Sequence, residues 1–373
     1  SYMNETMEML RLVFQTKNRQ TYVVDTTSRG GLEAVLNSAI YPGDAVLIPA
    51  FGRFGYLLAE ILERVGAEIT LLEREWGTVF EPEEIEKELK KKRYKAVACI
   101  HGETSTSMMQ PLEEIGQLCN RYGALLIVDT VATLGGVDIK VDKWGISACI
   151  SGTQKCLSAP SGSALITYNE QIEKIVSERK QVERGIRSSE DMETRNPKIP
   201  SNYLDLAQLE DYWGPRRLNH HTEATSMQYA VHEALRYVLE ETLEARCERH
   251  RLNDRALTAG LTAMGLKIFG DVSHKMPVVT AVCIPNGADG KKIRKELVDD
   301  FGIEIATSFG PLDGKIFRIG NMGYSSQKRN ILLTLGALEA VLRQNQIQIP
   351  AGEGVAAALE VYREHDSKNG FAE

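Results

Sequence analysis

Residues 124–155 read ALLIVDTVATLGGVDIKVDKWGISACISGTQK, and two short apolar runs within them are each followed by a polar residue of chemical interest. The first run ends before Asp129, and the second leads into Lys155. Short runs of this kind, bounded by Gly, Asp or Ser, are typical of buried strands. A crossover segment separates the two runs, so the stretch favours a parallel sheet, whose ligand sites lie at the carboxyl ends of the strands.

The same alternation of strand and helix patterns extends through the first half of the chain. Further strands are expected at 21–24, 45–48, 69–72, 96–100 and 164–168. Helical spacing of apolar residues fills most of the gaps, as Leu32 to Ala39 and Leu112 to Cys119 show. Strands joined by crossover helices predict an α/β fold with a doubly wound, mostly parallel sheet.

The second half of the chain has a different pattern. Residues 179–217 are polar and irregular but contain several aromatic residues, so we expect an ordered loop there. A long helical pattern at 223–257 is expected to bridge two domains. Strands and helices then alternate in an α+β unit, at 278–284, 291–301, 303–307, 316–320 and 328–343. We therefore predict a large α/β domain over residues 1–240 and a small α+β domain over 241–373.

Length and composition limit the classes of function. The 373 residues exceed the roughly 250 to 300 at which a single core stops growing, which agrees with two domains. The net charge is −7 and no long basic run is present, which argues against a nucleic-acid partner. The six cysteines have neither disulfide nor metal spacing, and no apolar run reaches the roughly 18 residues of a membrane helix. We expect a cytoplasmic protein that binds small molecules, without nucleic acid or membrane partners.

Four expected strand ends carry residues that could do chemistry: Asp129, Lys155, the stretch DTTSRGG at 25–31 and the stretch GETST at 102–106. Taken singly, each has an ordinary explanation as a helix cap, a solvated lysine, a capped helix start or a turn. Together they supply a phosphate cradle, a carboxylate and a lysine. Pyridoxal phosphate requires all three, for its phosphate, its ring nitrogen and its aldehyde.

Signals for other cofactors are weaker. No G-x-G-x-x-G opens the first helix, and residues 287–292 lack the spacing of a P-loop, so a dinucleotide or nucleotide enzyme fits poorly. His220 and His221 are adjacent, and no carboxylate stands at a ligand-like spacing from them such as that of H-E-x-x-H. We therefore expect no metal site.

With these motifs, the chain resembles the class V aminotransferases of the alanine–glyoxylate type, within fold type I of the pyridoxal-phosphate enzymes, the aspartate aminotransferase-like fold. Within that class it is most similar to the ureidoglycine–glyoxylate aminotransferases of purine catabolism. The resemblance covers nearly the whole chain. The matching stretches are 25–34, 51–66, 101–106, 126–136, 151–162, 217–222 and 309–323.

The resemblance implies a cofactor site built from these stretches. Lys155 would be the Schiff-base lysine, and Asp129 would be the partner of the pyridine nitrogen. Phe54 would stack on one face of the cofactor ring, and Val131 would pack on the other. The other implied cofactor contacts are Thr27, Ser28, Arg29 and Gln154 at the phosphate and the hydroxyl of Thr104.

The resemblance also implies three residues with roles in substrate binding and assembly. Arg318 matches the arginine that grips the substrate α-carboxylate with a bidentate fork. Asn219 stands where the alanine–glyoxylate enzymes tend to carry tyrosine and the ureidoglycine enzymes asparagine, whose amide can both donate to and accept from a ureido group. A loop-capping role for Asn219 is the alternative. Thr222 would reach the phosphate of the neighbouring subunit, so a homodimer with its sites at the interface is implied.

The implied reaction is a ping-pong transamination between (S)-ureidoglycine and glyoxylate, giving oxalurate and glycine in purine catabolism. A first alternative is an alanine or serine to glyoxylate aminotransferase, which differs only in the amino donor. A second is a cofactor-binding relative without turnover. Cysteine desulfurases belong to the same class, but Gln154 stands where they normally have histidine.

Overall fold

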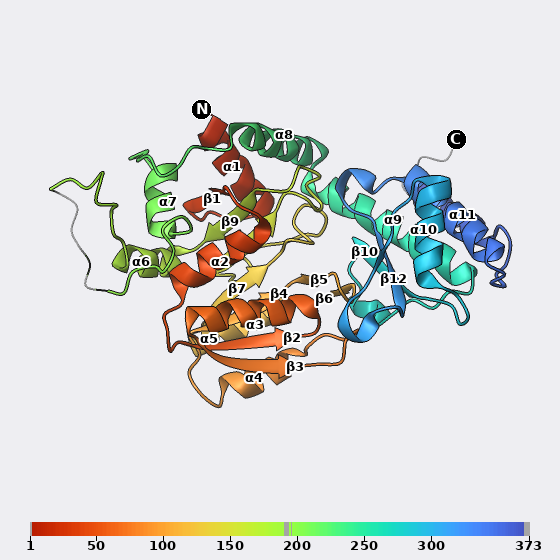
Figure 1. Cartoon of the computed structure of the whole chain (residues 1–373), viewed down its shortest axis with the longest axis horizontal. Coiled ribbons are helices and arrows are strands. Elements are labelled where there is room, and N and C mark those ends of the chain that lie inside the picture. The colour runs from red at the N-terminus through yellow and green to blue at the C-terminus, as the bar shows by residue number, and fades with distance from the viewer. Residues whose placement is uncertain (1, 190–193, 195, 369–373) are drawn as a thin grey trace.

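The computed structural model describes residues 2–189, 194 and 196–368, and the first part of the chain is built on one large sheet (Figure 1). Seven strands lie in the order β1-β9-β8-β7-β4-β2-β3. Their bounds are Gln20–Val24 (β1), Ala45–Ala50 (β2), Glu68–Glu73 (β3), Ala96–Ile100 (β4), Leu125–Asp129 (β7), Ala148–Gly152 (β8) and Ala164–Tyr168 (β9). Strand β9 runs antiparallel to both of its neighbours, β1 and β8, and the other pairs of this sheet are parallel, which confirms the predicted, mostly parallel arrangement.

The stretch 124–155 forms the adjacent strands β7 and β8, as predicted. All five residues of each strand are buried. The two strands pair in parallel, with Ile127 opposite Ala148 and Asp129 opposite Ile150. Because both chains run in the same direction, the polar residues at and after their ends emerge at the same edge of the sheet.

Helices pack against this sheet (Figure 1). Their bounds are Tyr2–Phe14 (α1), Ser28–Ala39 (α2), Arg53–Val65 (α3), Pro82–Leu89 (α4), Glu113–Tyr122 (α5), Glu170–Glu178 (α6), Leu206–Trp213 (α7) and Thr225–Glu241 (α8). Helix α2 lies close to the sheet, because a Cβ added to Gly31 would be only 2.5 Å from the Cβ of Ala164. This close contact places the start of α2 at the edge where β7 and β8 end.

The C-terminal part forms the right half of Figure 1 and contains a second, antiparallel sheet in the order β10-β12-β11. The bounds are Leu243–Ala263 (α9), Val279–Cys283 (β10), Gly290–Phe301 (α10), Ala306–Thr307 (β11), Ile316–Gly320 (β12), Lys328–Gln344 (α11) and Glu353–Lys368 (α12). The short elements are Gly102–Glu103 (β5), Met108–Met109 (β6) and the 3-10 turns Val272–His274, Gly310–Leu312 and Gly323–Ser325. The expected strand, helix, strand, strand, helix order is confirmed.

Two expectations about elements are wrong, and one helix was not predicted. The polar stretch 179–217 contains α7, which begins where the Asp205 side chain accepts a hydrogen bond from the Ala207 amide at 2.8 Å. The long helical pattern at 223–257 is two helices, since Thr242 has a φ of 70° and interrupts it. Its side chain accepts from the Ala245 amide and starts α9. Helix α12, beyond the last expected element, was not predicted.

Two apolar clusters form most of the core. The larger one extends along the sequence from Leu10 to Val238, and the other extends from Ala256 to Tyr362. The domain boundary between residues 240 and 241 stays a prediction.

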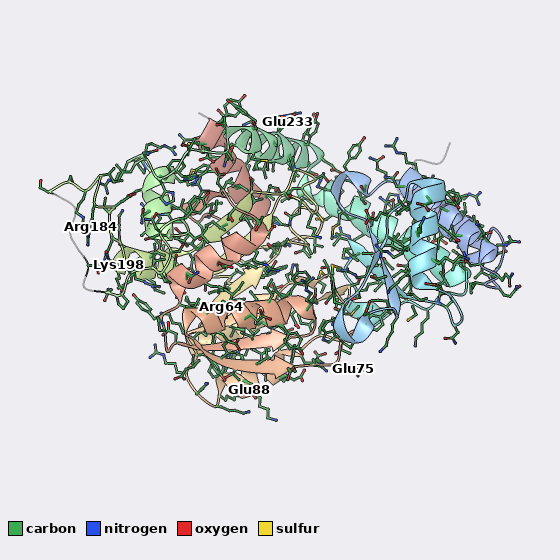
Figure 2. The ribbon with its side chains drawn as sticks, in the orientation of Figure 1. Arg64, Glu75, Glu88, Arg184, Lys198 and Glu233 are labelled. Carbon is green, nitrogen blue, oxygen red and sulfur yellow. The ribbon has the colours of Figure 1, made fainter. Side chains whose placement is uncertain are left out.

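The surface is rich in charged side chains. Figure 2 shows Glu233 at the upper edge of the molecule, and both Glu233 and Arg64 are exposed. Within the described part of the chain, no helix combines the length and the apolar character needed to cross a bilayer.

Candidate active site

A cavity of about 280 Å³ lies where β4, β7 and β8 end and where α2 and α3 begin. It brings together nine of the residues singled out in the sequence: Thr27, Ser28, Arg29, Phe54, Thr104, Asp129, Val131, Gln154 and Lys155. These residues come from five separate segments of the chain. The cavity is therefore the meeting point that the strand-end argument predicted.

One end of the cavity is suited to an anion. Thr27 precedes α2 in an extended conformation, and its side chain does not cap the first amides of the helix. Unpaired amides at a helix start attract phosphate. Beside them, the Gln154 Nε2 donates to Ser28 Oγ at 3.0 Å. A Cβ at Gly152 would collide with that hydroxyl oxygen, so the absence of a side chain at the end of β8 permits this arrangement.

Asp129 is the buried last residue of β7. Its Oδ1 accepts a hydrogen bond from the Val131 amide at 2.8 Å. Burial raises the pKa of its carboxyl from 3.8 to about 7. The ionised form would be favoured by a cationic group placed in the cavity, such as a protonated ring nitrogen.

Lys155 follows β8 and is half-buried in the cavity wall. Burial lowers the pKa of its amine, and the positive charge of Arg318 acts in the same direction. A lowered pKa makes the neutral, nucleophilic amine more available at a given pH. Its environment is therefore that of a reactive lysine and not of a solvated one.

Arg318 lies next to the cavity. It is half-buried on β12, where its Nε donates to the Thr307 carbonyl and its Nη1 to the Thr104 carbonyl, each at 2.7 Å. Its guanidinium also lies over the ring of Phe309, 5.1 Å from the centroid. The structure thus connects this expected substrate residue to Thr104 of the cavity.

Asn219 and Thr222 lie outside the cavity of their own chain. Both are exposed, and Asn219 borders a separate small hollow near Leu218 and Gln208. Their roles toward substrate and cofactor stay predictions.

Among the described residues, one group of side chains has the spacing of metal ligands: Asp25, His221 and Glu223, with ligand atoms within 4.8 Å of one another. Sequence spacing missed the group because Asp25 is far from the histidines in the chain. Both carboxylates already accept hydrogen bonds at 2.6 Å, Asp25 from the Ala224 amide and Glu223 from the Tyr212 hydroxyl. The group therefore holds the loop of His221 at the end of β1. The absence of a metal site stays a prediction.

Part of the cavity wall was not predicted from the sequence. Its apolar and backbone surfaces come from Leu32, Leu57, Ile100, Gly102 and Ala132. Leu32 and Leu57 lie on the helices that carry Ser28 and Phe54, one turn further along. Helical spacing could have identified these two, whereas nothing local marks the other three.

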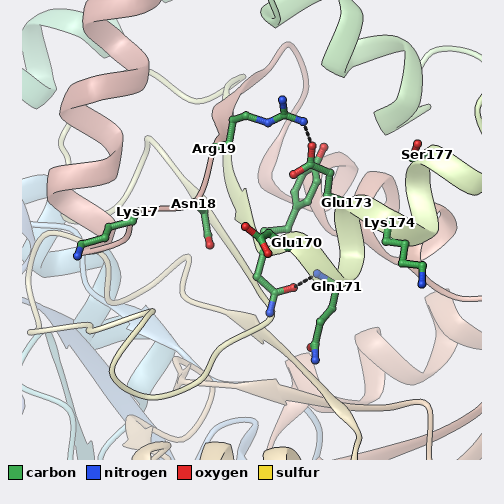
Figure 3. A pocket seen from close by; sticks show the side chains of 10 residues that line it. Lys17, Asn18, Arg19, Glu170, Gln171, Glu173, Lys174 and Ser177 are labelled. Atoms are coloured by element: carbon green, nitrogen blue, oxygen red, sulfur yellow. Dashed lines mark hydrogen bonds and ion pairs between the residues drawn. The ribbon is translucent and has the colours of Figure 1, made fainter.

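A larger, more open hollow of about 940 Å³ lies near the start of α6 (Figure 3). Arg19 forms an ion pair with Glu173 there, and the Asn169 side chain accepts a hydrogen bond from the Gln171 amide at 3.1 Å. These bonds cap a helix and join opposite charges. The hollow contains neither Asp129 nor Lys155, so we place the chemistry in the smaller cavity.

The smaller cavity fits pyridoxal phosphate by the chemistry of its groups. The start of α2 offers amide and hydroxyl donors, Asp129 offers a buried carboxylate and Lys155 offers an amine. Phe54 adds an aromatic surface. No single one of these groups is specific, but their convergence matches the requirements of this cofactor.

Comparisons with known proteins agree with this chemistry. The family model for class V aminotransferases matches residues 1–312. The (S)-ureidoglycine–glyoxylate transaminase of Bacillus subtilis is 60% identical over 362 residues, 96% of this chain and 87% of that protein. The crystal structure of ureidoglycine–glyoxylate aminotransferase from Bacillus subtilis has a TM-score of 0.91 at 58% identity, and covers 97% of this chain and 89% of that one.

A more distant relative matches nearly as much of the chain. The alanine–glyoxylate aminotransferase of Callithrix jacchus is 35% identical over 345 residues, 91% of this chain and 80% of that protein. The similarity in structure confirms the expected fold, fold type I of the pyridoxal-phosphate enzymes. On sequence, fold and site chemistry together, this chain belongs to the class V aminotransferases.

Proposed function

We propose that this chain uses pyridoxal phosphate to transfer the amino group of (S)-ureidoglycine to glyoxylate, yielding oxalurate and glycine in purine catabolism. The observation that carries the proposal is the convergence of Asp129, Lys155 and the start of α2 in one cavity. The 60% identity to the Bacillus subtilis transaminase supports this choice of substrates.

Pyridoxal phosphate, when bound, supplies an aldehyde that takes up amino groups and a ring that delocalises negative charge. Asp129 would keep the ring nitrogen protonated, because a cation in contact relieves the cost of its buried charge. Phe54 and Val131 would enclose the ring. The remaining contacts would come from Thr27, Ser28, Arg29, Gln154 and Thr104.

Lys155 would anchor the cofactor and also act as the general base. Its lowered pKa favours the neutral amine, which can take the proton from the substrate carbon that bears the amino group. Arg318 would orient the substrate α-carboxylate with the N–H groups that are not donated to Thr104 and Thr307. Together, Arg318 can hold the amino donor by its carboxylate, and Lys155 can then remove the proton.

The active unit we propose is a homodimer in the cytoplasm. Asn219 and Thr222 are exposed and outside the cavity of their own chain, which fits residues that serve the site of a second subunit. The six cysteines are all free, which suits a reducing compartment.

Alanine or serine as the amino donor is the second candidate. The 35% identity to an alanine–glyoxylate aminotransferase favours it. Asn219 argues for ureidoglycine, because an amide can form hydrogen bonds with a ureido group in both directions.

The test is a spectrum of the purified protein with pyridoxal phosphate, followed by one amino donor at a time and then glyoxylate. Ureidoglycine should remove the absorbance band of the lysine-bound cofactor, and glyoxylate should restore it with release of glycine. Lys155→Ala should abolish the band and turnover together. Lys174→Ala, an exposed lysine at the larger hollow, should leave both unchanged.

The other outcomes separate the candidates. If only alanine or serine removed the absorbance band, the amino donor would be one of these two and not ureidoglycine. Turnover at the wild-type rate in Lys155→Ala would refute the assignment of this cavity.

A further inference from the structure

Glu103 is a fully buried carboxylate directly before the cavity residue Thr104. Its Oε2 accepts a hydrogen bond from the Phe54 amide at 2.8 Å. Its Oε1 accepts from the Ser105 amide at 3.0 Å and from the Ser105 hydroxyl at 2.5 Å. The same hydroxyl oxygen accepts from the Arg53 amide at 3.0 Å. One carboxylate and one hydroxyl therefore bind the first two amides of α3.

The contact between this carboxylate and α3 is close. A Cβ added to Gly52, the residue before the helix, would collide with the side chain of Glu103. Burial raises the pKa of Glu103, whereas the hydrogen bonds from Ser105 and Phe54 act in the opposite direction. The first amides of a helix lack partners within it and carry the positive end of its dipole. The buried amides at the helix start thus have an acceptor, and the buried carboxylate has donors.

The peptide after Glu103 supports the substrate arginine. The carbonyl of Thr104 accepts from Arg318 Nη1 at 2.7 Å, and the carbonyl of Ser105 accepts from the Ser308 hydroxyl at 2.6 Å. Arg318 and Ser308 both belong to the C-terminal part of the chain. This short segment therefore joins the start of α3, the cavity and the C-terminal sheet.

We propose that Glu103 is a positioning residue, which fixes Phe54 against the cofactor and holds Thr104, and through it Arg318, in place for the substrate. The inference rests on the proposed function, because it assumes that Phe54 stacks on pyridoxal phosphate. A glutamine at this position would have nearly the same size, but its NH₂ group would face an N–H donor. Glu103→Gln therefore removes the acceptor at one of the two oxygens and keeps the volume.

The test compares Glu103→Gln with Asp205→Asn, a buried carboxylate outside the cavity that accepts the Ala207 amide at the start of α7. In the cofactor-free protein, hydrogen exchange of the Phe54 amide should become at least about tenfold faster in Glu103→Gln. The Kd of pyridoxal phosphate, measured by fluorescence titration, should rise about tenfold, equivalent to about 1.4 kcal/mol. Asp205→Asn should change neither quantity.

Steady-state kinetics adds a third measurement. Glu103→Gln should raise the KM of the amino donor more than it lowers kcat, because Arg318 loses its fixed orientation. A residue that only stabilises the fold would lower the Tm without changing exchange at Phe54 or the KM. Exchange and Kd both within about twofold of the wild type would overturn the inference.

A second variant covers the case in which Glu103→Gln does not fold. Ser105→Ala removes only the hydroxyl that links Glu103 to the Arg53 amide, and it should show the same changes to a smaller extent. Wild-type exchange and Kd in Ser105→Ala would then count against the role of Glu103. A wild-type protein that binds no pyridoxal phosphate, or transfers no amino group, would instead show that the proposed function is wrong.

Discussion

Arg318, on β12, donates its Nη1 hydrogen to the backbone carbonyl of Thr104 across 2.7 Å, and so links the C-terminal sheet to the cavity. Its Nε is held in the same way by the Thr307 carbonyl. These bonds use two of the five N–H groups of the guanidinium and leave three for a carboxylate. The plane of the group is thus oriented before a substrate arrives, which lowers the entropic cost of binding.

Replacing Arg318 by lysine tests this orientation. The ammonium keeps the charge but cannot bind two backbone carbonyls and a carboxylate in one plane. Arg318→Lys should raise the KM of the amino donor at least about tenfold, with cofactor affinity unchanged. Arg294→Lys is the matched control, since the Nε of Arg294 also donates to a carbonyl, that of Ile305 at 2.7 Å. An unchanged KM in Arg318→Lys would show that Arg318 does not bind the substrate carboxylate.

Replacing Asp129 by asparagine should separate stability from activity. Burial raises the pKa of Asp129 to about 7 in the folded protein. Its contribution to stability is thus complete below about pH 4 and is lost as the pH rises through about 7. Cofactor-free Asp129→Asn should unfold at a higher temperature than the wild type at about pH 8, with at most about 1.4 kcal/mol gained per unit of raised pKa.

The same variant should lose turnover by about 100-fold or more, because the ring nitrogen would no longer face a charge. Thermal unfolding of the cofactor-free protein across pH gives the first result, and single-turnover kinetics gives the second. Equal Tm values at all pH values would contradict the raised pKa of this buried carboxyl.

Adding one methyl group at Gly152 should weaken the phosphate end of the cavity. The new Cβ would collide with the Ser28 hydroxyl, which is held by Gln154. Gly152→Ala should raise the Kd of pyridoxal phosphate at least about tenfold, since a displaced donor costs about as much as a lost hydrogen bond to a charged group. Gly185→Ala, where nothing lies within 4 Å of the added atom, is the control. Equal affinities in a titration would exclude Ser28 and Gln154 from phosphate binding.

Much of the large sheet and cavity could be predicted because the signals are local. The runs before Asp129 and Lys155 are short, apolar and bounded by small or polar residues, so the strand ends are visible in the sequence. Parallel pairing of β7 and β8 then brings these two ends to one edge. General rules of α/β folds favour such pairing of consecutive strands but do not fix it, since β3 and β4 follow one another in the chain and are not neighbours in the sheet.

The features that could not be predicted depend on single residues or on distant contacts. Helix α7 has only eight residues and relies on the Asp205 cap. The positive φ of Thr242 leaves no trace in the helical pattern on either side. Asp25 and His221 are far apart in the sequence and come into contact only in the folded chain. Glu103, in a stretch that also fits a turn, shows its role only through hydrogen bonds to α3.

The two carboxylates next to His221, Asp25 and Glu223, should make the stability of the protein depend on pH. Burial raises the pKa of Glu223 to about 7, and the charge of Asp25 adds to the effect. Stability from this group is present below about pH 4.5 and is lost as the pH rises through about 7. Glu223→Gln should flatten the fall of Tm between about pH 5 and 8. Glu233→Gln, an exposed carboxylate on α8, should leave that slope as it is, and an unaltered slope in Glu223→Gln would count against the pair.

The choice of amino donor should depend on Asn219 through the second subunit. Asn219→Tyr removes an amide that can bind a ureido group, so kcat/KM for ureidoglycine should fall at least about tenfold while that for alanine falls less. Mixed dimers test the geometry. An Asn219→Tyr chain paired with a Lys155→Ala chain has one intact lysine, whose site would use the Asn219 of the inactive chain. Such dimers should keep the ureidoglycine preference, and loss of that preference would place Asn219 in its own subunit's site.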